Sequence, residues 1–309
     1  MARTLWRSQI NKYKRVITFG CSWTKYFWPT WANGISDILD LPLVNQGCAG
    51  TGNIAILNRM LAWDLEYGFN DTDLVLVNWS AFAREDRIRN GHWITGGSVF
   101  NSKFYDDKFI REYWNEENDF VKNAGAIIMA NRLFNIAYQS CMPGEYLQSQ
   151  IKFQKREEEN WLNTRHSVFK SRQGWYNTWN SQISHIQDFD QVGEQDKSWE
   201  EVANDNHPNI LTHTCHAIKI AKHFGFEDTD KLDKVKEAYK QLHDNIFSDL
   251  IKIGSKRIGK EKKRTIVAQT VELNLEKIGR SKDFQCHDSD FTWHGLWIET
   301  NRMLPNKRV

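Results

Sequence analysis

The chain has 309 residues, of which 40% are hydrophobic and 26% charged, and its formal net charge is +2. This composition is typical of a globular protein, and so small a net charge gives no electrostatic argument for nucleic acid as a partner. No apolar stretch is long enough to span a bilayer, and the first residues do not resemble a secretory signal. The 5 cysteines form no Cys-x-x-Cys pair, so we expect reduced thiols and a cytoplasmic location.

The first part of the chain alternates strands and helices. Residues 15–20 predict a buried strand that runs directly into Gly20-Cys21-Ser22, and residues 31–39 predict a helix after Pro29. A short strand at 43–44 leads into a glycine-rich stretch at 45–52. A helix capped by Asn53 should follow.

Residues 73–80 form a nearly continuous apolar run, typical of a strand buried in a parallel sheet. Strand, helix, strand, helix and strand in this order predict an α/β fold with a parallel sheet covered on both faces. Ligands of such sheets bind beyond the carboxyl ends of the strands. Here those ends carry Ser22, the glycine-rich stretch and residues 78–80.

The middle of the chain has a weaker pattern. Residues 84–118 are polar and aromatic and predict an inserted loop over the strand ends. A helical face returns at 120–134, and we expect a fourth strand near 146–153. A helix with Leu211, Cys215 and Ile218 on one side should end near residue 225.

The last part predicts an extension rather than more of the same sheet. Residues 232–250 carry a long amphipathic stripe, residues 252–264 form a basic connector, and residues 264–275 favour a strand. We therefore expect a domain at 1–225 and a helical or mixed extension at 226–309, of a size that suits a small subdomain or an assembly surface.

Several polar residues have the types and the order that acyl transfer requires. Ser22 at a strand end would attack an ester carbonyl, His207 would take its proton, and Asp205 would orient the imidazole. Backbone N–H groups and a polar side chain would hold the oxyanion.

These residues resemble the sequence blocks of the SGNH (GDSL-type) hydrolase family over residues 15 to about 225. Gly20-Cys21-Ser22 stands for the first block, with Cys21 in place of its aspartate, and Gly50 matches the glycine of the second. The Asn-Asp of the third block is missing, so that Asn78 or Ser80 would have to act as the third oxyanion donor. Asp205 with His207 resembles the last block. The pattern is most similar to SGNH-like proteins of phages and marine bacteria.

The resemblance implies a three-layer α/β/α domain of the flavodoxin-like SGNH type. It also implies an esterase or deacylase that needs no cofactor and no metal. The oxyanion hole would combine the N–H groups of Ser22 and Gly50 with Asn78 or Ser80. The substrate would be a small-molecule or glycan ester, and the 14 Trp and 9 Tyr suit stacking on sugar rings, although they equally fill cores.

Other assignments stay open at this stage. Asp290 with His294 is a second candidate acid–base pair, and Cys21 is a rival nucleophile. A histidine-rich helix offers four candidate metal ligands, His213, Cys215, His216 and His223. A zinc site would need a second closely spaced pair of ligands, which the sequence does not show. The altered third block also allows a protein without catalysis that binds carbohydrate or joins an oligomer or a viral assembly.

Overall fold

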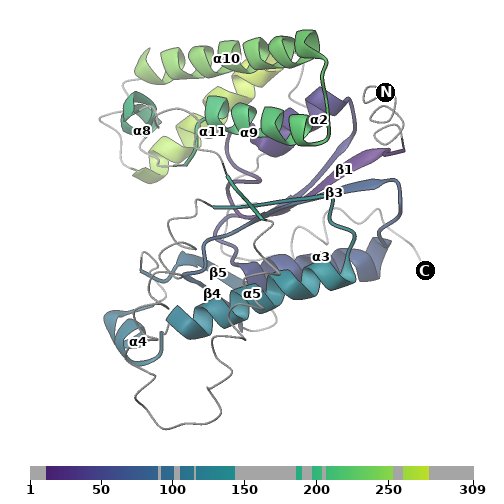
Figure 1. Ribbon diagram of the computed structural model, residues 1–309. Helices are drawn as coiled ribbons and strands as arrows, with labels where there is room; N and C mark the ends of the chain where they lie inside the picture. Colours follow the sequence, from purple (N-terminus) through teal and green to yellow (C-terminus); the bar gives the residue numbers. More distant parts are fainter. Residues whose placement is uncertain are drawn as a thin grey trace, which may run out of the picture.

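The computed structural model describes residues 12–89, 92–100, 105–114, 116–142, 186–189, 197–203, 207–252 and 260–277. Helices and strands alternate through most of these residues (Figure 1). In chain order they are β1 (Arg15–Gly20), α2 (Trp31–Leu39), β2 (Leu43–Gly47), α3 (Asn53–Tyr67), β3 (Asp73–Trp79), β4 (Arg84–Arg89), β5 (His92–Ser98), α4 (Asp107–Glu112), α5 (Glu116–Leu133), β6 (Tyr138–Cys141), β7 (Gln187–Asp188), α8 (Lys197–Ala203), α9 (Ile210–His223), α10 (Thr229–Lys252) and α11 (Lys260–Lys277).

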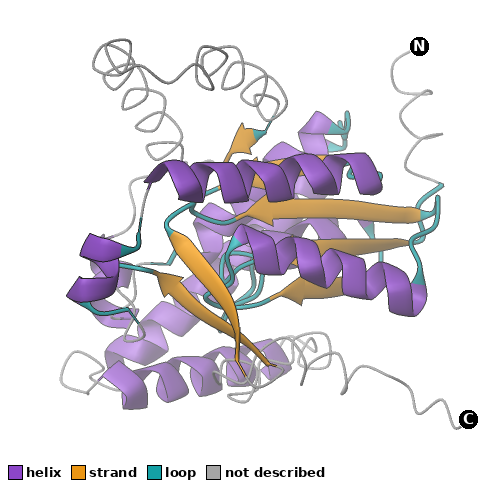
Figure 2. Ribbon diagram, turned by 90° about the horizontal axis from the view of Figure 1, so that it is seen from below, coloured by secondary structure: helices purple, strands orange, loops and turns teal. Residues whose placement is uncertain are grey.

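The main sheet is parallel and has the strand order β2-β1-β3-β6-β7. Its strands run side by side in one direction, whereas β4 and β5 form a separate ribbon (Figure 2). In the register of the sheet, Gly20 at the end of β1 lies opposite Gly47 of β2 and Asn78 of β3. The chain leaves β1 toward one side and later continues on its other side, and ligands of α/β sheets bind at such a reversal.

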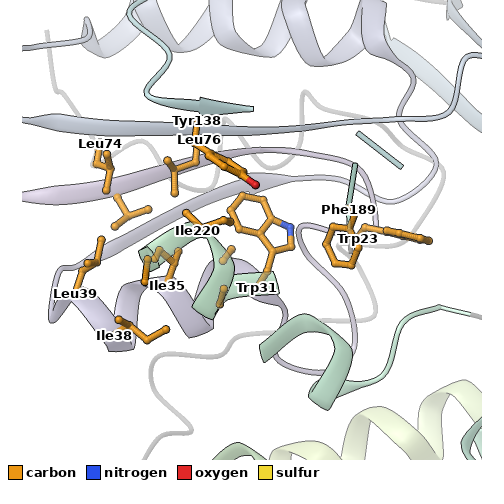
Figure 3. Close-up of a cluster of buried hydrophobic side chains, with 14 of the residues drawn as sticks. Trp23, Trp31, Ile35, Ile38, Leu39, Leu74, Leu76, Tyr138, Phe189 and Ile220 are labelled. Atoms are coloured by element: carbon orange, nitrogen blue, oxygen red, sulfur yellow. The ribbon is translucent and has the colours of Figure 1, made fainter. Parts of the chain in front are cut away.

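Helices cover both faces of this sheet, which gives three layers (Figure 1). Alternate residues of β3 point to opposite faces, because side chains in a strand alternate. Val75 and Val77 pack with α3 and α5, and Leu76 packs with α2 and α9. Figure 3 shows the second of these cores, where Trp31 of α2 lies against side chains of the sheet. The expected α/β class with a parallel sheet is confirmed.

The fourth strand is not where the sequence predicted it. It is β6, which pairs with β3 at residues 138–141 and directly follows α5. The sequence placed the strand that continues the sheet after β3 near 146–153, and this placement was wrong. Residues 146–153 themselves lie outside the described part of the chain. Four residues with one aromatic side chain give no detectable period, so pairing with β3 rather than local pattern defines this strand.

The inserted region is more regular than a loop. Residues 84–89 and 92–98 pair as the antiparallel hairpin β4–β5, and a short helix, α4, follows at 107–112. A small cluster of Ala83, Val99 and Tyr105 packs the base of this hairpin against the α4 region. The expected loop is therefore corrected to a hairpin and a helix.

Two helices, α10 and α11, lie next to each other after α9 (Figure 1). Residues 264–275 favoured a strand, but they belong to helix α11, whose Val267 and Val271 are buried together with Leu242 and Ile246 of α10. The apolar stripe of α10 also reaches α2 and α9, with Leu232 in the core beside the sheet. The domain boundary expected near residue 226 stays a prediction.

Helix α9 lies where the sequence placed it, but it buries a different face from the predicted one. Leu211, Cys215 and Ile218 are only partly buried, whereas Ala217 and Ile220 are fully buried against α2 and the sheet. A glycine of α2, Gly34, comes so close that a Cβ atom there would lie 2.8 Å from the Cβ of Ala217. The small residues thus set how closely α9 approaches, and with it the position of the residues just before the helix.

Candidate functional site

Ser22 lies in a tight turn at the carboxyl end of β1. The carbonyl of Cys21 accepts hydrogen bonds from the N–H groups of Thr24 and Lys25, at 2.9 and 3.2 Å. A Cβ atom on Gly20 would lie 2.1 Å from Oγ1 of Thr24 and 2.7 Å from the carbonyl oxygen of Asn78, so the turn requires glycine there. Only 4% of the surface of Ser22 is exposed.

His207 comes from a distant part of the chain and meets this turn. Its Nε2 lies 2.8 Å from Oγ of Ser22. The imidazole stacks on the ring of Tyr26, with 4.0 Å between the ring centroids and 21° between the planes. The next residue is held as well, because the indole N–H of Trp28 donates to the carbonyl of Pro208 at 2.9 Å. The turn that carries Ser22 and the segment after it therefore hold the histidine in place.

The expected third member of the triad, Asp205, lies outside the described residues. So do Asp290 and His294, the second candidate pair. Both assignments stay predictions.

Gly50 lies in the loop between β2 and α3, residues 48–52, which we call the glycine loop. Its φ angle is +76°, a conformation that favours glycine. Within the described residues, the backbone N–H groups of Ser22 and Gly50 donate to no acceptor. Two free N–H groups on neighbouring strand ends are what an oxyanion hole requires.

The hairpin β4–β5 holds the glycine loop through three residues. The N–H of Gly97 donates to the carbonyl of Gly50 at 3.0 Å, and Nη1 of Arg84 donates to the carbonyl of Thr51 at 3.0 Å. The carboxylate of Asp86 accepts hydrogen bonds from the N–H groups of Gly52, at 2.8 Å, and Ala55, at 3.0 Å. The inserted region therefore fixes the position of the glycine loop.

Asp86 has an unusual environment for a carboxyl group. Burial raises its pKa to about 6, and the two backbone hydrogen bonds and the nearby Arg84 offset part of this effect. Its bonds to Gly52 and Ala55 also satisfy N–H groups at the start of α3, where a helix leaves such groups unpaired. The sequence assigned this cap to Asn53, which was wrong, because Gly52 is the residue that precedes the helix.

Asn53 instead anchors the end of β3. Its side-chain oxygen accepts from the N–H of Ser80 at 2.7 Å, and its side-chain nitrogen donates to the carbonyl of Ser80 at 3.1 Å. The hydroxyl of Ser80 lies 3.9 Å from Sδ of Met142, a weak acceptor. The backbone of Ser80 is thus fixed, while its hydroxyl has no strong acceptor among the described residues.

Asn78 is placed differently. Its side chain is fully buried on the α9 side of the sheet, and its amide nitrogen donates to Oγ of Ser140 at 2.8 Å. This position does not favour the oxyanion role that the sequence gave to Asn78 or Ser80 in common. Of the two residues, Ser80 is the one whose hydroxyl lies beside Met142 at the carboxyl ends of the strands.

Sequence reasoning missed Arg84 and Met142 as part of this site. The sulfur of Met142, just after β6, lies 3.8 Å from Sγ of Cys21, 3.9 Å from Oγ of Ser80 and 3.6 Å from Nη2 of Arg84. It therefore joins the ends of three neighbouring strands. A methionine after a four-residue strand carries no sequence signal of its own.

The guanidinium of Arg84 lies next to the glycine loop, and one of its nitrogens makes no hydrogen bond with the described residues. Nη1 is bonded to a backbone carbonyl and Nη2 to the sulfur of Met142, while the buried Nε has no acceptor among the described residues. Arg84 begins β4, in a region that the sequence predicted to be a loop, so the sequence offered no reason to assign it to the site.

A second serine–histidine pair lies inside the protein. Nε2 of His216 is 3.2 Å from Oγ of Ser140, and neither residue is exposed. Burial lowers the pKa of His216 to about 3, with a smaller effect of Lys219, so this histidine is neutral. Because no substrate can reach Ser140, we assign this pair to the core.

The buried histidines of α9 are not part of a cluster of candidate metal ligands among the described residues. Burial, followed by the nearby His216 and His207, lowers the pKa of His213 well below its usual value. Both ring nitrogens of His213 lack a hydrogen-bond partner among the residues that the structure describes, and its ring contacts Phe189 edge-on. Within the part of the chain that the structure describes, no group of three or more ligating side chains converges. Cys21, the rival nucleophile, is buried as well, and its thiol packs in the core.

Comparison with known proteins adds no further assignment. No protein-family model, no curated protein and no solved structure matches this chain. Among the helices described, none has the length and apolar character needed to cross a membrane.

Proposed function

We propose that this protein is a serine esterase or deacylase of the SGNH type, with the flavodoxin-like fold of that family. One observation carries the proposal: Oγ of Ser22 lies 2.8 Å from Nε2 of His207 at the carboxyl end of β1, which has β2 on one side and β3 on the other. A distance between 2.6 and 3.2 Å is the reach of a general base. The parallel sheet with helices on both faces supports the family assignment but does not by itself define a function.

In the proposed reaction, Oγ of Ser22 attacks the acyl carbon of an ester while its proton moves to Nε2 of His207. The oxyanion that forms accepts hydrogen bonds from the free N–H groups of Ser22 and Gly50. As the carbon–oxygen bond to the alcohol breaks, His207 returns the proton to the departing oxygen. Water then hydrolyses the acyl-serine with the same histidine as base. Asp205 would orient the imidazole.

The third oxyanion donor of the family is missing from its usual place. We propose that Ser80 and the guanidinium of Arg84 supply it. Both lie beside Met142 at the strand ends, and the Arg84 guanidinium has a buried N–H without an acceptor among the described residues. A positive charge near the developing oxyanion would stabilise it more strongly than a neutral donor, because charge-assisted hydrogen bonds are about twice as strong.

The decisive experiment is labelling with a fluorophosphonate probe, followed by intact-mass spectrometry. We expect one adduct on the wild-type protein and none on Ser22→Ala. The matched control is Ser248→Ala, an exposed serine on α10, which should label like the wild type. If the wild type does not label under conditions in which a known serine hydrolase labels completely, the esterase proposal is wrong.

The alternative is a protein of the same fold that binds carbohydrate or a viral assembly without catalysis. The altered third block is the observation behind it. Absence of labelling, together with binding to a glycan, would favour this alternative.

A further inference from the structure

A cavity lies in the inserted region and is lined by residues of β4, of α5 and of α4 and the segment after it. The hairpin β4–β5 and α4 lie on the same side of the sheet as α3 and α5 (Figure 1). The cavity encloses about 310 Å³ between β4, α4 and α5. This is at the lower end of the volumes of small-ligand pockets, which run from about 300 to 1,000 Å³. No role in the proposed ester hydrolysis requires it.

One wall of this cavity is aromatic and is supplied by α4 and the residues after it. Phe109 and Tyr113 stack with their ring centroids 6.1 Å apart, and 66% of Tyr113 is exposed. The ring of Trp114 is fixed in two ways. Its indole N–H donates to Oδ2 of Asp119 at 2.5 Å, and Phe100 contacts it edge-on at 4.8 Å. Aromatic rings held in place in this manner bind a flat ligand at a small cost in entropy.

The polar wall has two acidic and two basic side chains. Lys122 of α5 forms an ion pair with Glu85 of β4, with Nζ 3.0 Å from Oε2. The guanidinium of Arg87 lies 4.6 Å from the ring centroid of Phe109. Asp119 is bonded to Trp114. Two carboxylates against two cations leave no net charge, so the cavity suits a neutral ligand rich in hydrogen-bonding groups rather than an anion.

The cavity and the glycine loop lie on opposite sides of the same strand. Successive side chains of β4 alternate in direction. Arg84 and Asp86 contact the glycine loop, whereas Glu85 and Arg87 line the cavity. A ligand in the cavity is thus separated from the glycine loop by strand β4, so that a ligand that reaches both would have to be an extended one, such as an oligosaccharide chain.

We infer that this cavity binds a sugar ring of a neutral oligosaccharide, stacked on the exposed face of Tyr113. Hydroxyl groups of the sugar would donate to Glu85 and accept from Arg87 and Lys122. The inference rests on the proposed function in one respect: the oligosaccharide is the alcohol part of the ester that Ser22 cleaves. The binding itself does not depend on catalysis.

The test is isothermal titration calorimetry of the full chain carrying Ser22→Ala with xylotetraose, cellotetraose, mannotetraose and chitotetraose. We expect at least one of them to bind. Adding Tyr113→Ala should weaken that binding about tenfold, because it removes the stacking ring. Adding Tyr113→Phe should preserve the affinity. Tyr67→Ala, a partly exposed tyrosine on α3, is the matched control and should change nothing.

A second measurement separates the cavity from the catalytic site. With the Ser22 hydroxyl present, Tyr113→Ala should leave kcat/KM for para-nitrophenyl acetate unchanged and lower it only for an acetylated form of the oligosaccharide that binds. The inference is overturned if none of the neutral tetrasaccharides binds, if Tyr113→Ala binds them as well as its parent, or if only an anionic galacturonate oligomer binds. Binding without fluorophosphonate labelling would overturn the esterase proposal but not the cavity.

Discussion

Ser22 and His207 are separated by 185 positions in the chain, yet Oγ of one lies 2.8 Å from Nε2 of the other. The contact depends on two separate supports. The serine stands on a turn after β1, and the histidine stacks on Tyr26 just before α9. Because both supports are anchored in buried structure, the pair is held in place before any substrate binds.

The first prediction concerns His207. In His207→Gln the hydroxyl of Ser22 loses its base, so kcat for an ester that the wild type cleaves should fall about 100- to 10,000-fold. Labelling by the fluorophosphonate should slow to a similar degree. His223→Gln, an exposed histidine at the end of α9, is the control. Equal activity of the His207 variant and the wild type would exclude His207 as the base.

The second prediction separates the two candidate acid partners. Asp205→Asn should lower kcat strongly, since the imidazole loses the group that orients it and stabilises its positive charge. Asp290→Asn should have little effect on steady-state kinetics with the same ester. The reverse result, with His294→Gln also inactive, would move the acid–base pair to the end of the chain.

The third prediction concerns Arg84. If its guanidinium stabilises the oxyanion, Arg84→Met should lower kcat by about 100- to 1,000-fold, as removal of one oxyanion donor does. KM should change little. With para-nitrophenyl acetate, an ester too small to reach the cavity, Arg87→Met is a suitable control, because this arginine lies on the same strand but lines the cavity. An increase in KM with kcat unchanged would instead assign Arg84 to substrate binding.

The fourth prediction uses the raised pKa of Asp86. Folding raises this pKa from 3.8 to about 6, so the protonated carboxyl is favoured in the folded state. The stabilisation that the protonated carboxyl of Asp86 contributes to the folded state is complete below pH 3.8 and is lost as the pH rises through about 6. The change corresponds to at most about 3 kcal/mol in the free energy of unfolding.

Asp86→Asn should remove this dependence. Urea unfolding of the wild type and the variant between about pH 4 and pH 7 should show the stability of the wild type falling relative to that of the variant. Asp71→Asn, an exposed carboxylate, should not alter the profile. A constant difference between the wild type and Asp86→Asn at every pH would contradict the prediction.

The parts of the fold that the sequence predicted are those in which burial leaves a continuous or periodic pattern. The strands β1 and β3 are mostly apolar because both faces of the sheet are covered, and α5 and α9 repeat their apolar residues with helical spacing. Ser22 could be singled out for the same reason: it follows the end of a recognisable strand.

Other elements could not be read locally. Residues 264–275 contain β-branched side chains that favour a strand, but Val267 and Val271 pack as a helix on the apolar stripe of α10. β6 is short and mixed in composition, and only its pairing with β3 makes it a strand. In both cases a partner distant in sequence overrides the local preference.

The sequence by itself determined the α/β class, the parallel order of the first three strands and the serine at the end of β1. The tertiary structure decided that His207 meets Ser22, that the glycine loop is held by Arg84, Asp86 and Gly97, and that Ser140 and His216 form a second, buried pair. The physical reason is that a strand or helix is specified by the period of its own side chains. A hydrogen bond between segments depends on how closely whole layers pack, and no local pattern records that distance.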